Sequence, residues 1–321
     1  MDNTAATSIS MKPGTKFQSR LRQLKRDLYR DRFMLMIFSL PLAYYIIFKY
    51  LPMYGIIISF MDYYPLKGIK GSEWVGLKHY IDFFNSVYFS RTVINTLVLN
   101  LYQIMIAFPM PIIFALLLNE VRNSKLKKTI QTISYLPYFI SMVVVVGLFM
   151  NFLSPSTGIV NQIITGLGLE PVFFLAEPKF FPFIYTIMYT WKMLGWDAVI
   201  YLAALTTIDV QQYEATIIDG ATKLQQVRYI TIPGITNTIV IMFLVKLGSI
   251  LNVEFESILL MYNPAIYSTA DVISTFVYRK GIVDANYSFA TAVNVFQSVI
   301  GFVLLVIGNK LSNKYTESGL W

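Results

Sequence analysis

Long apolar runs constrain this chain more than any other feature of its sequence. Six of them follow one another, and the second, third and sixth contain no charged residue. Each is long enough for the roughly 20 residues that a helix needs to cross the hydrocarbon core of a bilayer. The runs occupy residues 33–60, 92–119, 129–153, 180–208, 235–260 and 285–309. They predict an all-α integral membrane protein with six transmembrane helices, which together form a membrane domain over residues 33–310.

The overall composition excludes the two other broad classes of chain. Of the 321 residues, 55% are hydrophobic and only 14% are charged, against about 45–50% and about 25% in soluble domains. A chain so apolar cannot remain a solvated coil either. Prolines inside the runs are tolerable in a membrane, where neighbouring helices satisfy the freed backbone groups. The first run is longer than a straight span requires, so we expect a kink near Pro52.

The N-terminal arm, residues 1–32, is polar and basic. Within it Phe17, Leu21, Leu24 and Leu28 recur at helical spacing, with Arg, Lys and Gln on the other faces. Such a pattern is typical of an amphipathic helix that lies on an anionic leaflet. An equally good interpretation is a solvated positive arm that only sets the topology. A short polar tail, residues 311–321, ends the chain.

The basic residues indicate the orientation in the membrane. The formal net charge is +8, which by itself would allow a nucleic-acid partner. Alternate connections, however, carry 16 and 7 Lys and Arg residues, the larger number on the side of the two termini. Under the positive-inside rule this bias places both termini in the cytoplasm. The positive charge is then a topological signal, and nucleic-acid binding loses its support.

Residues that could support catalysis or metal binding are scarce. The chain has no Cys and one His, which excludes thiol chemistry and makes a His-rich or Cys-rich metal centre improbable. No phosphate-binding GxxxxGK[ST] segment occurs, so the chain alone cannot hydrolyse ATP. For His79, in the first outward loop among aromatic residues, we expect a packing or hydrogen-bonding role. The sequence therefore predicts neither an enzyme nor a bound metal or cofactor.

The connection over residues 209–234 is polar but patterned. It contains two pairs with the spacing of a helix-capping box, Asp209 with Gln212 and Thr222 with Gln225, which predict two short helices. Gly220 lies at their joint, where a residue with positive φ is needed to end the first helix. Pro233 is expected to stop the second helix. A rigid elbow of this kind is suited to dock into a soluble partner.

The elbow resembles the "EAA loop" of binding-protein-dependent ABC importer permeases. The resemblance rests on Glu214, Ala215, Asp219, Gly220, Ala221, Ile230, Ile232 and Pro233. Thr216 stands where that motif usually has a second Ala. The stretch EWVGLKHYIDFF with Phe89, Asn95 and Thr96, and the segment YTWKMLGWDAVIYLAALTTI, are similar to the MalF-like sugar-importer permeases, with His79 in place of the usual Asn. PMYGIIISFMDYYP and the terminal SGLW are similar to a branch of that family that is often found in Gram-positive bacteria.

The resemblance implies a type I ABC importer permease fold in a bacterial cell membrane. The chain would form half of the translocation pathway for an oligosaccharide and would pair with a second, homologous permease. Two ATPase subunits that hold ATP and Mg would dock on the elbow, and a lipid-anchored binding protein would deliver the sugar from outside. The residues expected to couple to the ATPases are Glu214, Ala215, Asp219, Gly220, Ala221 and Pro233.

Polar residues inside the spans are costly and need a reason. One interpretation is that Lys192, Lys246, Asn252 and Glu254 line the translocation cavity and bind sugar hydroxyls. The alternative is that they join the two permeases and never contact substrate. Trp191 and Trp196 could stack on a sugar ring, although Trp is also common in interfacial belts and lipid-facing packing. The lysines hint at an acidic oligosaccharide that contains uronate.

Three other functions stay open on the sequence alone. An importer for an amino acid, a peptide or phosphate would share the elbow motif but not the sugar-family stretch. A membrane-embedded glycan enzyme would need paired carboxylates, and only Glu254 and Glu256 approach that, on different sides of a helix. A channel would conduct without any ATPase.

Overall fold

The computed structural model describes residues 23, 26–316 and 319–320 of the chain. These residues divide into two compact units, one that ends at Ile57 and one that begins at Ile58, and each is described by itself. Of the stripe expected in the N-terminal arm, Phe17, Leu21 and Leu24 lie outside the described residues. The interfacial helix therefore stays a prediction.

The first unit is a run of helix whose type changes along its length. It contains α2 (Arg32–Tyr45), the π-helical turn η1 (Ile46–Tyr50) and α3 (Leu51–Met53), and it leads into the 3₁₀ segment η2 (Tyr54–Phe60). The apolar side chains of α2 are exposed over nearly its whole length, for example Phe33, Met34 and Leu40. Such a surface suits a lipid environment rather than water. The helix type changes around Pro52, but Arg32–Phe60 is one continuous candidate span, so the expected kink near Pro52 stays a prediction.

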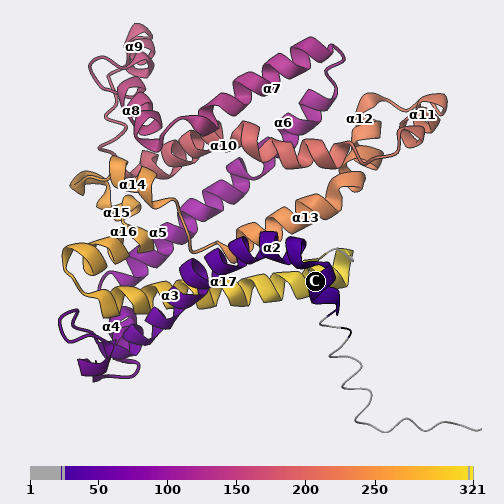
Figure 1. Cartoon of the computed structure of the whole chain (residues 1–321). Coiled ribbons are helices and arrows are strands. Elements are labelled where there is room, and N and C mark those ends of the chain that lie inside the picture. Colours follow the sequence, from indigo (N-terminus) through magenta and orange to yellow (C-terminus); the bar gives the residue numbers. More distant parts are fainter. Residues whose placement is uncertain (1–22, 24–25, 317–318, 321) are drawn as a thin grey trace, which may run out of the picture. The chain divides into compact units, whose positions relative to one another are not determined.

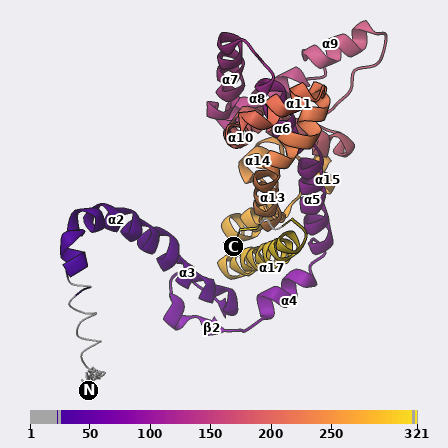
Figure 2. The same cartoon turned by 90° about the vertical axis from the view of Figure 1, so that its right-hand side faces the viewer.

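The second unit contains five further apolar segments (Figures 1 and 2). Their helices are α5 (Phe89–Tyr102) and α6 (Pro109–Asn119), joined by η4 (Gln103–Ala107), then α7 (Ser124–Phe139) with α8 (Met142–Phe152), α10 (Phe181–Leu205), α13 (Ile232–Gly248) and α17 (Tyr287–Thr316). One apolar core cluster joins α8, α10 and α14 (Phe255–Met261) around Tyr185, Met188 and Ile258. A second joins α6, α10 and α13 around Ala115, Tyr201 and Ile235.

Among the described residues, four helices are long and apolar enough to cross a membrane, and the count reaches up to six when two bent pairs are each taken as one span. The continuous ones are Arg32–Phe60, Phe89–Asn119, Lys223–Gly248 and Tyr287–Lys314. The pair α7 and α8 bends by 101°, and the helix Pro178–Leu205 bends by 74° toward α11 (Val210–Ile218). The all-helical membrane architecture predicted from the apolar runs is confirmed.

Two of the expected runs are interrupted where the sequence gives no sign of a break. The third breaks between Phe139 and Met142, and the fifth ends at Gly248, short of the expected residue 260. Both breaks are possible because distant side chains satisfy the freed carbonyls. After Gly248, Gln297 donates to the Leu251 carbonyl over 2.7 Å. Backbone that leaves a helix at membrane depth requires such partners within the protein.

Three prolines follow a π-helical turn by two residues each. They are Pro52 after η1, Pro109 after η4 and Pro233 after η6 (Val227–Thr231). In η4, for example, the Phe108 N–H donates to the Gln103 carbonyl, five residues back, over 2.8 Å. Proline has no N–H and crowds the carbonyl four residues earlier, so a wider turn just before it lets the helix continue. The prediction that Pro233 stops a helix is therefore wrong, because the helix runs from Lys223 to Gly248.

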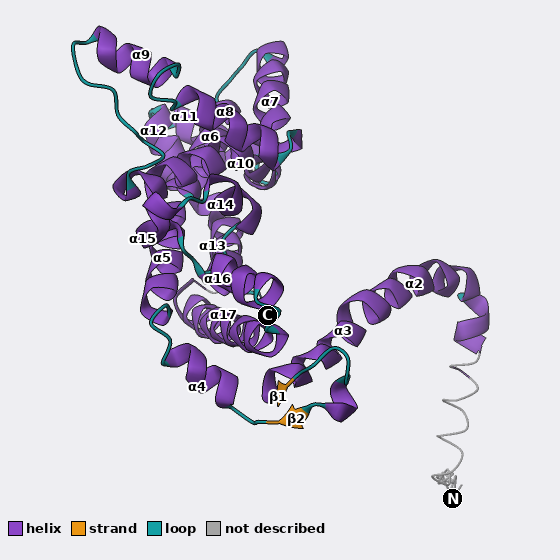
Figure 3. Ribbon diagram, turned by 90° about the vertical axis from the view of Figure 1, so that its left-hand side faces the viewer, coloured by secondary structure: helices purple, strands orange, loops and turns teal. Residues whose placement is uncertain are grey.

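The remaining short elements of the second unit lie in its connections. A hairpin of β1 (Met61–Asp62) and β2 (Glu73–Trp74) pairs Met61 with Trp74 and leads into α4 (Lys78–Phe84) (Figure 3). The others are α9 (Ile159–Gly166), α12 (Lys223–Gln226), α15 (Tyr267–Ala270), α16 (Ile273–Tyr278) and the turns η3 (Ile69–Gly71), η5 (Pro178–Phe180), η7 (Pro264–Ile266) and η8 (Arg279–Val283). His79 is buried in α4, and its Nε2 lies 3.0 Å from the Met61 carbonyl and 3.1 Å from Asp62 Oδ1. The expected hydrogen-bonding role of His79 is confirmed.

Candidate functional site

The elbow, residues 209–234, forms at one end of the second unit, where α11 and α12 meet at an angle (Figure 1). Gly220 has φ +74°, the left-handed conformation expected at the joint. The capping box of Thr222 is complete: Thr222 N donates to Gln225 Oε1 over 2.7 Å, and Gln225 N donates to Thr222 Oγ1 over 3.4 Å. Asp209 instead accepts from the Gln211 N–H over 2.9 Å, so its pairing with Gln212 is not the predicted box.

Most of the predicted coupling residues are exposed on this elbow. Glu214, Ala215, Asp219 and Gly220 are exposed, and Ala221 is half-buried. Pro233 is also exposed but lies within α13, beyond the π-helical turn η6 that follows α12. Their role in coupling stays a prediction.

Two features of the elbow were missed from the sequence. The first is an apolar tip, formed by Ile217, Ile218 and Leu224, whose exposed fractions are 60%, 86% and 78%. The second is a brace: the Tyr213 hydroxyl and Thr231 Oγ1 lie 3.0 Å apart and join α11 to η6. A braced element with an exposed apolar tip has the surface of a protein contact rather than of a solvated loop.

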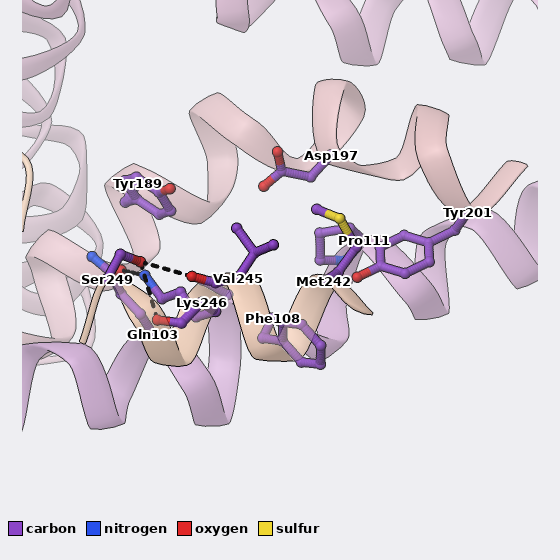
Figure 4. Close-up of a pocket in the computed structure, with 11 residues that line it drawn as sticks. Gln103, Phe108, Pro111, Tyr189, Asp197, Tyr201, Met242, Val245, Lys246 and Ser249 are labelled. Carbon is purple, nitrogen blue, oxygen red and sulfur yellow. Dashed lines mark hydrogen bonds between the residues drawn. The ribbon is translucent and has the colours of Figure 1, made fainter. Parts of the chain in front are cut away.

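A cavity of about 220 Å³ lies between three helical segments of the second unit. Gln103, Phe108 and Pro111 line it from η4 and α6, Tyr189, Asp197 and Tyr201 from α10, and Met242, Val245, Lys246 and Ser249 from α13 and the turn after it (Figure 4). The mixture of aromatic, aliphatic and a few polar groups is typical of a ligand pocket.

Lys246 is the one predicted pathway residue that lines this cavity. Its ammonium donates a hydrogen bond to Gln103 Oε1, and it lies 5.9 Å from the centroid of the Tyr189 ring. Asp197 lines the same cavity from α10 and carries the opposite charge. Gln103 was missed because an uncharged amide in an apolar run carries no clear signal in a single sequence.

Gln103 also connects the cavity to the break after α13. Its Nε2 donates to the Tyr185 hydroxyl over 3.2 Å, and the Glu254 backbone N–H donates to the same hydroxyl over 3.2 Å. Tyr185 is fully buried. A continuous set of hydrogen bonds thus joins Lys246 on α13 with the segment that carries Glu254.

The other predicted pathway residues lie outside the cavity lining. Asn252 is exposed, and its carbonyl accepts from Asn100 Nδ2 over 3.3 Å. Glu254 is half-buried and accepts from Ser257 Oγ over 3.4 Å. Trp191 is 40% exposed and packs near Phe149, at 6.0 Å between ring centroids.

Trp196 and Lys192 lie together where α10 crosses the end of α7. The Trp196 ring stacks on Tyr138, with centroids 4.3 Å apart and planes 5° from parallel, and 46% of Trp196 stays exposed. Lys192 is buried and donates to backbone carbonyls of residues 137–140. The structure thus brings Lys192 and Trp196 together, at a place separate from the cavity that Lys246 lines.

A buried ion cluster joins α5 to the segment between α14 and α17. Asp271 is fully buried and accepts from Arg91 over 2.5 Å, from Arg279 over 3.1 Å and from the Tyr262 hydroxyl over 2.8 Å. Burial alone would raise the pKa of this carboxyl, but the hydrogen bonds from Arg279, Tyr262 and Arg91 hold it below its usual range. Asp271 is an anchor that the sequence did not indicate.

Comparison with known proteins indicates a transport protein. Residues 107–315 match the family described as "Binding-protein-dependent transport system inner membrane component". The chain is 41% identical over 294 residues to Protein LplB of Bacillus subtilis (strain 168), covering 92% of each chain. It is 40% identical over 300 residues to the polygalacturonan/rhamnogalacturonan transport system permease protein YteP of the same organism, covering 94% of each.

Solved structures agree in fold as well as in sequence. One chain from a bacterial ABC transporter involved in the import of the acidic polysaccharide alginate has a TM-score of 0.84 and 41% identity, covering 92% of this chain and 99% of that one. Another, from the alginate transporter in complex with an alginate pentasaccharide-bound periplasmic protein, has a TM-score of 0.85 and 40% identity, covering 93% and 100%.

Proposed function

The chain belongs to the family of binding-protein-dependent transport system inner membrane components, and we propose that it forms half of the translocation pathway for an acidic oligosaccharide. It is a multi-pass permease subunit of an ABC importer for oligosaccharide or polysaccharide, and it is not an enzyme. ATP hydrolysis belongs to separate ATPase subunits, as the family implies.

The position of Lys246 in the cavity is the observation that supports an acidic substrate. It is the one basic residue that lines the cavity, and its ammonium hydrogen-bonds to the Gln103 amide. An ammonium can exchange that neutral acceptor for a uronate carboxylate, which gives a stronger, charge-assisted hydrogen bond. Relatives named for polygalacturonan/rhamnogalacturonan and for alginate support the same class of substrate.

The remaining pathway residues would contact the uncharged parts of the sugar. Trp191 and Trp196 present partly exposed rings, which suit the apolar faces of pyranose rings. Asn252 and Glu254 follow α13 and offer an amide and a carboxylate to hydroxyl groups.

The elbow would carry the mechanical coupling. We assign Glu214, Ala215, Asp219, Gly220 and Ala221 to the ATPase contact because they are exposed on, or beside, the braced helix α11. Pro233 would connect that contact to α13, which reaches the cavity at Lys246. ATP-driven movement of the elbow would in this way change the cavity.

The assembly that follows contains a periplasmic oligosaccharide-binding protein and further transporter subunits, as in the alginate transporter complex. We propose a second homologous permease, two ATPase subunits with ATP and Mg, and a lipid anchor on the binding protein. Both termini would face the cytoplasm, on the side of the larger basic charge.

Uptake by the reconstituted transporter tests the proposal. The full complex in liposomes, with ATP inside and loaded binding protein outside, should accumulate an acidic oligosaccharide in preference to a neutral one of equal length. Complexes without internal ATP serve as the control and should take up neither. Uptake of neither sugar by the energised complex would refute the sugar assignment, and flux without ATP would favour a channel.

A further inference from the structure

Lys192 is buried at the break between α7 and α8, with 9% of its surface exposed. Its Nζ donates to the carbonyl oxygens of Ile140 over 2.5 Å, of Tyr138 over 3.0 Å and of Pro137 over 3.4 Å. An ammonium has three N–H donors. All of them are therefore used by the protein backbone.

The break places these three carbonyls at a helix end, and the Pro137 carbonyl also accepts from the Ile140 N–H over 3.2 Å. The last carbonyls of a helix have no partner within it, and α7 ends at Phe139, where the chain bends by 101° into α8. The C-terminal end of a helix also carries partial negative charge, which favours a cation there. The nearest described partners of the Lys192 ammonium are thus the carbonyls of the helix end, and Glu254 is close enough to interact with its charge electrostatically.

The same face of α10 holds α7 at two further positions. Lys192, Gly195 and Trp196 are spaced i, i+3 and i+4, which places them on one side of the helix. A Cβ atom on Gly195 would lie 2.1 Å from the Ser134 carbonyl oxygen, so the two backbones are in direct contact there. Trp196 stacks on Tyr138, whose own carbonyl Lys192 binds.

We infer that Lys192 is a positioning residue of the translocation pathway: it holds the end of α7 so that Tyr138 stays stacked beneath the exposed ring of Trp196, and it does not contact the sugar. The inference rests on the proposed function for its importance to transport. It replaces direct contact between Lys192 and an acidic sugar by an indirect role that affects neutral and acidic sugars alike.

The test compares Lys192→Met with Lys192→Arg in the reconstituted complex. Loss of the three hydrogen bonds from a charged donor should lower the uptake of a neutral and of an acidic oligosaccharide by the same factor, about tenfold. Amide hydrogen exchange over residues 138–144, followed by mass spectrometry, should become faster in Lys192→Met. Lys192→Arg keeps donors at the site and should restore part of both properties.

A second variant keeps the inference testable if Lys192→Met does not assemble. Tyr138→Leu removes the stacked ring but leaves Lys192 and its carbonyl partners in place, so uptake should fall for both sugars while exchange over residues 138–144 stays as in the parent protein. Wild-type uptake by Tyr138→Leu would overturn the inference. So would a Lys192→Met loss confined to the acidic sugar, with unchanged exchange. Failure of the parent complex to transport either sugar would refute the proposed function instead, and the exchange data would still decide the role of Lys192.

Discussion

At the scale of single residues, Asp271 is the best-defined anchor outside the membrane-spanning segments. Two arginines, 36% and 30% exposed, converge on this fully buried carboxylate. Breaking a buried pair costs about 3–5 kcal/mol, and partial exposure of both arginines reduces this to about 2–3 kcal/mol. We expect Asp271→Asn to lower the melting temperature of the detergent-solubilised protein, whereas Asp82→Asn, at an exposed position, should leave it unchanged.

The same carboxylate predicts a pH dependence with a definite sign. The pKa of Asp271 is lower in the folded protein than in an unfolded chain, where it is about 3.9. Its contribution is therefore fully present above about pH 4 and is lost as the pH falls toward the folded-state pKa. The difference in melting temperature between the parent protein and Asp271→Asn should narrow below about pH 4. A constant difference down to pH 3 would contradict this assignment.

Lys246 gives a residue-scale prediction about substrate. Removing one partner of a desolvated charge contact costs about 2 kcal/mol or more, so Lys246→Met should lower the uptake of an acidic oligosaccharide about tenfold or more relative to a neutral one. The matched control is Lys310→Met, at an exposed position of α17. Equal losses for the two sugars in Lys246→Met would place this lysine in assembly rather than in recognition.

At the scale of elements, the elbow depends on the backbone of one glycine. Nothing lies within 4 Å of a Cβ atom built on Gly220, so a side chain there is opposed by the φ of +74° and not by crowding. A β-branched residue in this conformation costs about 1–2 kcal/mol, which is enough to change the angle between α11 and α12. Gly220→Val should insert normally but abolish ATP-dependent uptake.

Gly220→Asn is the informative companion, because Asn adopts the left-handed conformation more readily than other residues with a side chain. It should retain much of the uptake that Gly220→Val loses. Both variants should appear in the membrane at parent levels by immunoblot. Parent-like uptake in Gly220→Val would show that the angle of the elbow does not matter for coupling.

The elements also show which parts of the fold a sequence can predict. The helical spans follow from local composition, and the Thr222 capping box follows from two residues three apart. The breaks at residues 140–141 and 249–254 do not, because each depends on a side chain from a distant helix, Lys192 or Gln297, that satisfies the freed carbonyls. The prediction that Pro233 ends a helix was wrong for a related reason. The π-helical turn before Pro233 lets the helix continue, and the residue types do not specify that turn.

The candidate site was predictable to a different degree in its two parts. The elbow is a local motif, and the sequence identified its joint at Gly220 but not its exposed apolar tip. The cavity brings together Gln103, Tyr189 and Lys246, which lie far apart in the chain. Of these only Lys246 was predicted, because it carries a charge inside a membrane span. Gln103 lies in a run without any charged residue, and Tyr189 is one of 22 tyrosines.

At the scale of the whole molecule, the membrane topology predicts which loops lie on which side of the membrane. The proposed arrangement, six spans with both termini in the cytoplasm, would put the elbow inside the cell and the β1–β2 hairpin outside. The chain has no Cys, so a single introduced thiol is a unique label. Leu66 in the hairpin is fully exposed, and Thr222 in the elbow is exposed as well.

In intact cells a membrane-impermeant maleimide should label Leu66→Cys and not Thr222→Cys, and both should react once the cells are opened. The reverse pattern would invert the orientation. Labelling of both variants in intact cells would mean that an even number of spans separates the hairpin from the elbow, instead of the proposed three. Either result would place the elbow outside the cell, where cytoplasmic ATPases cannot reach it.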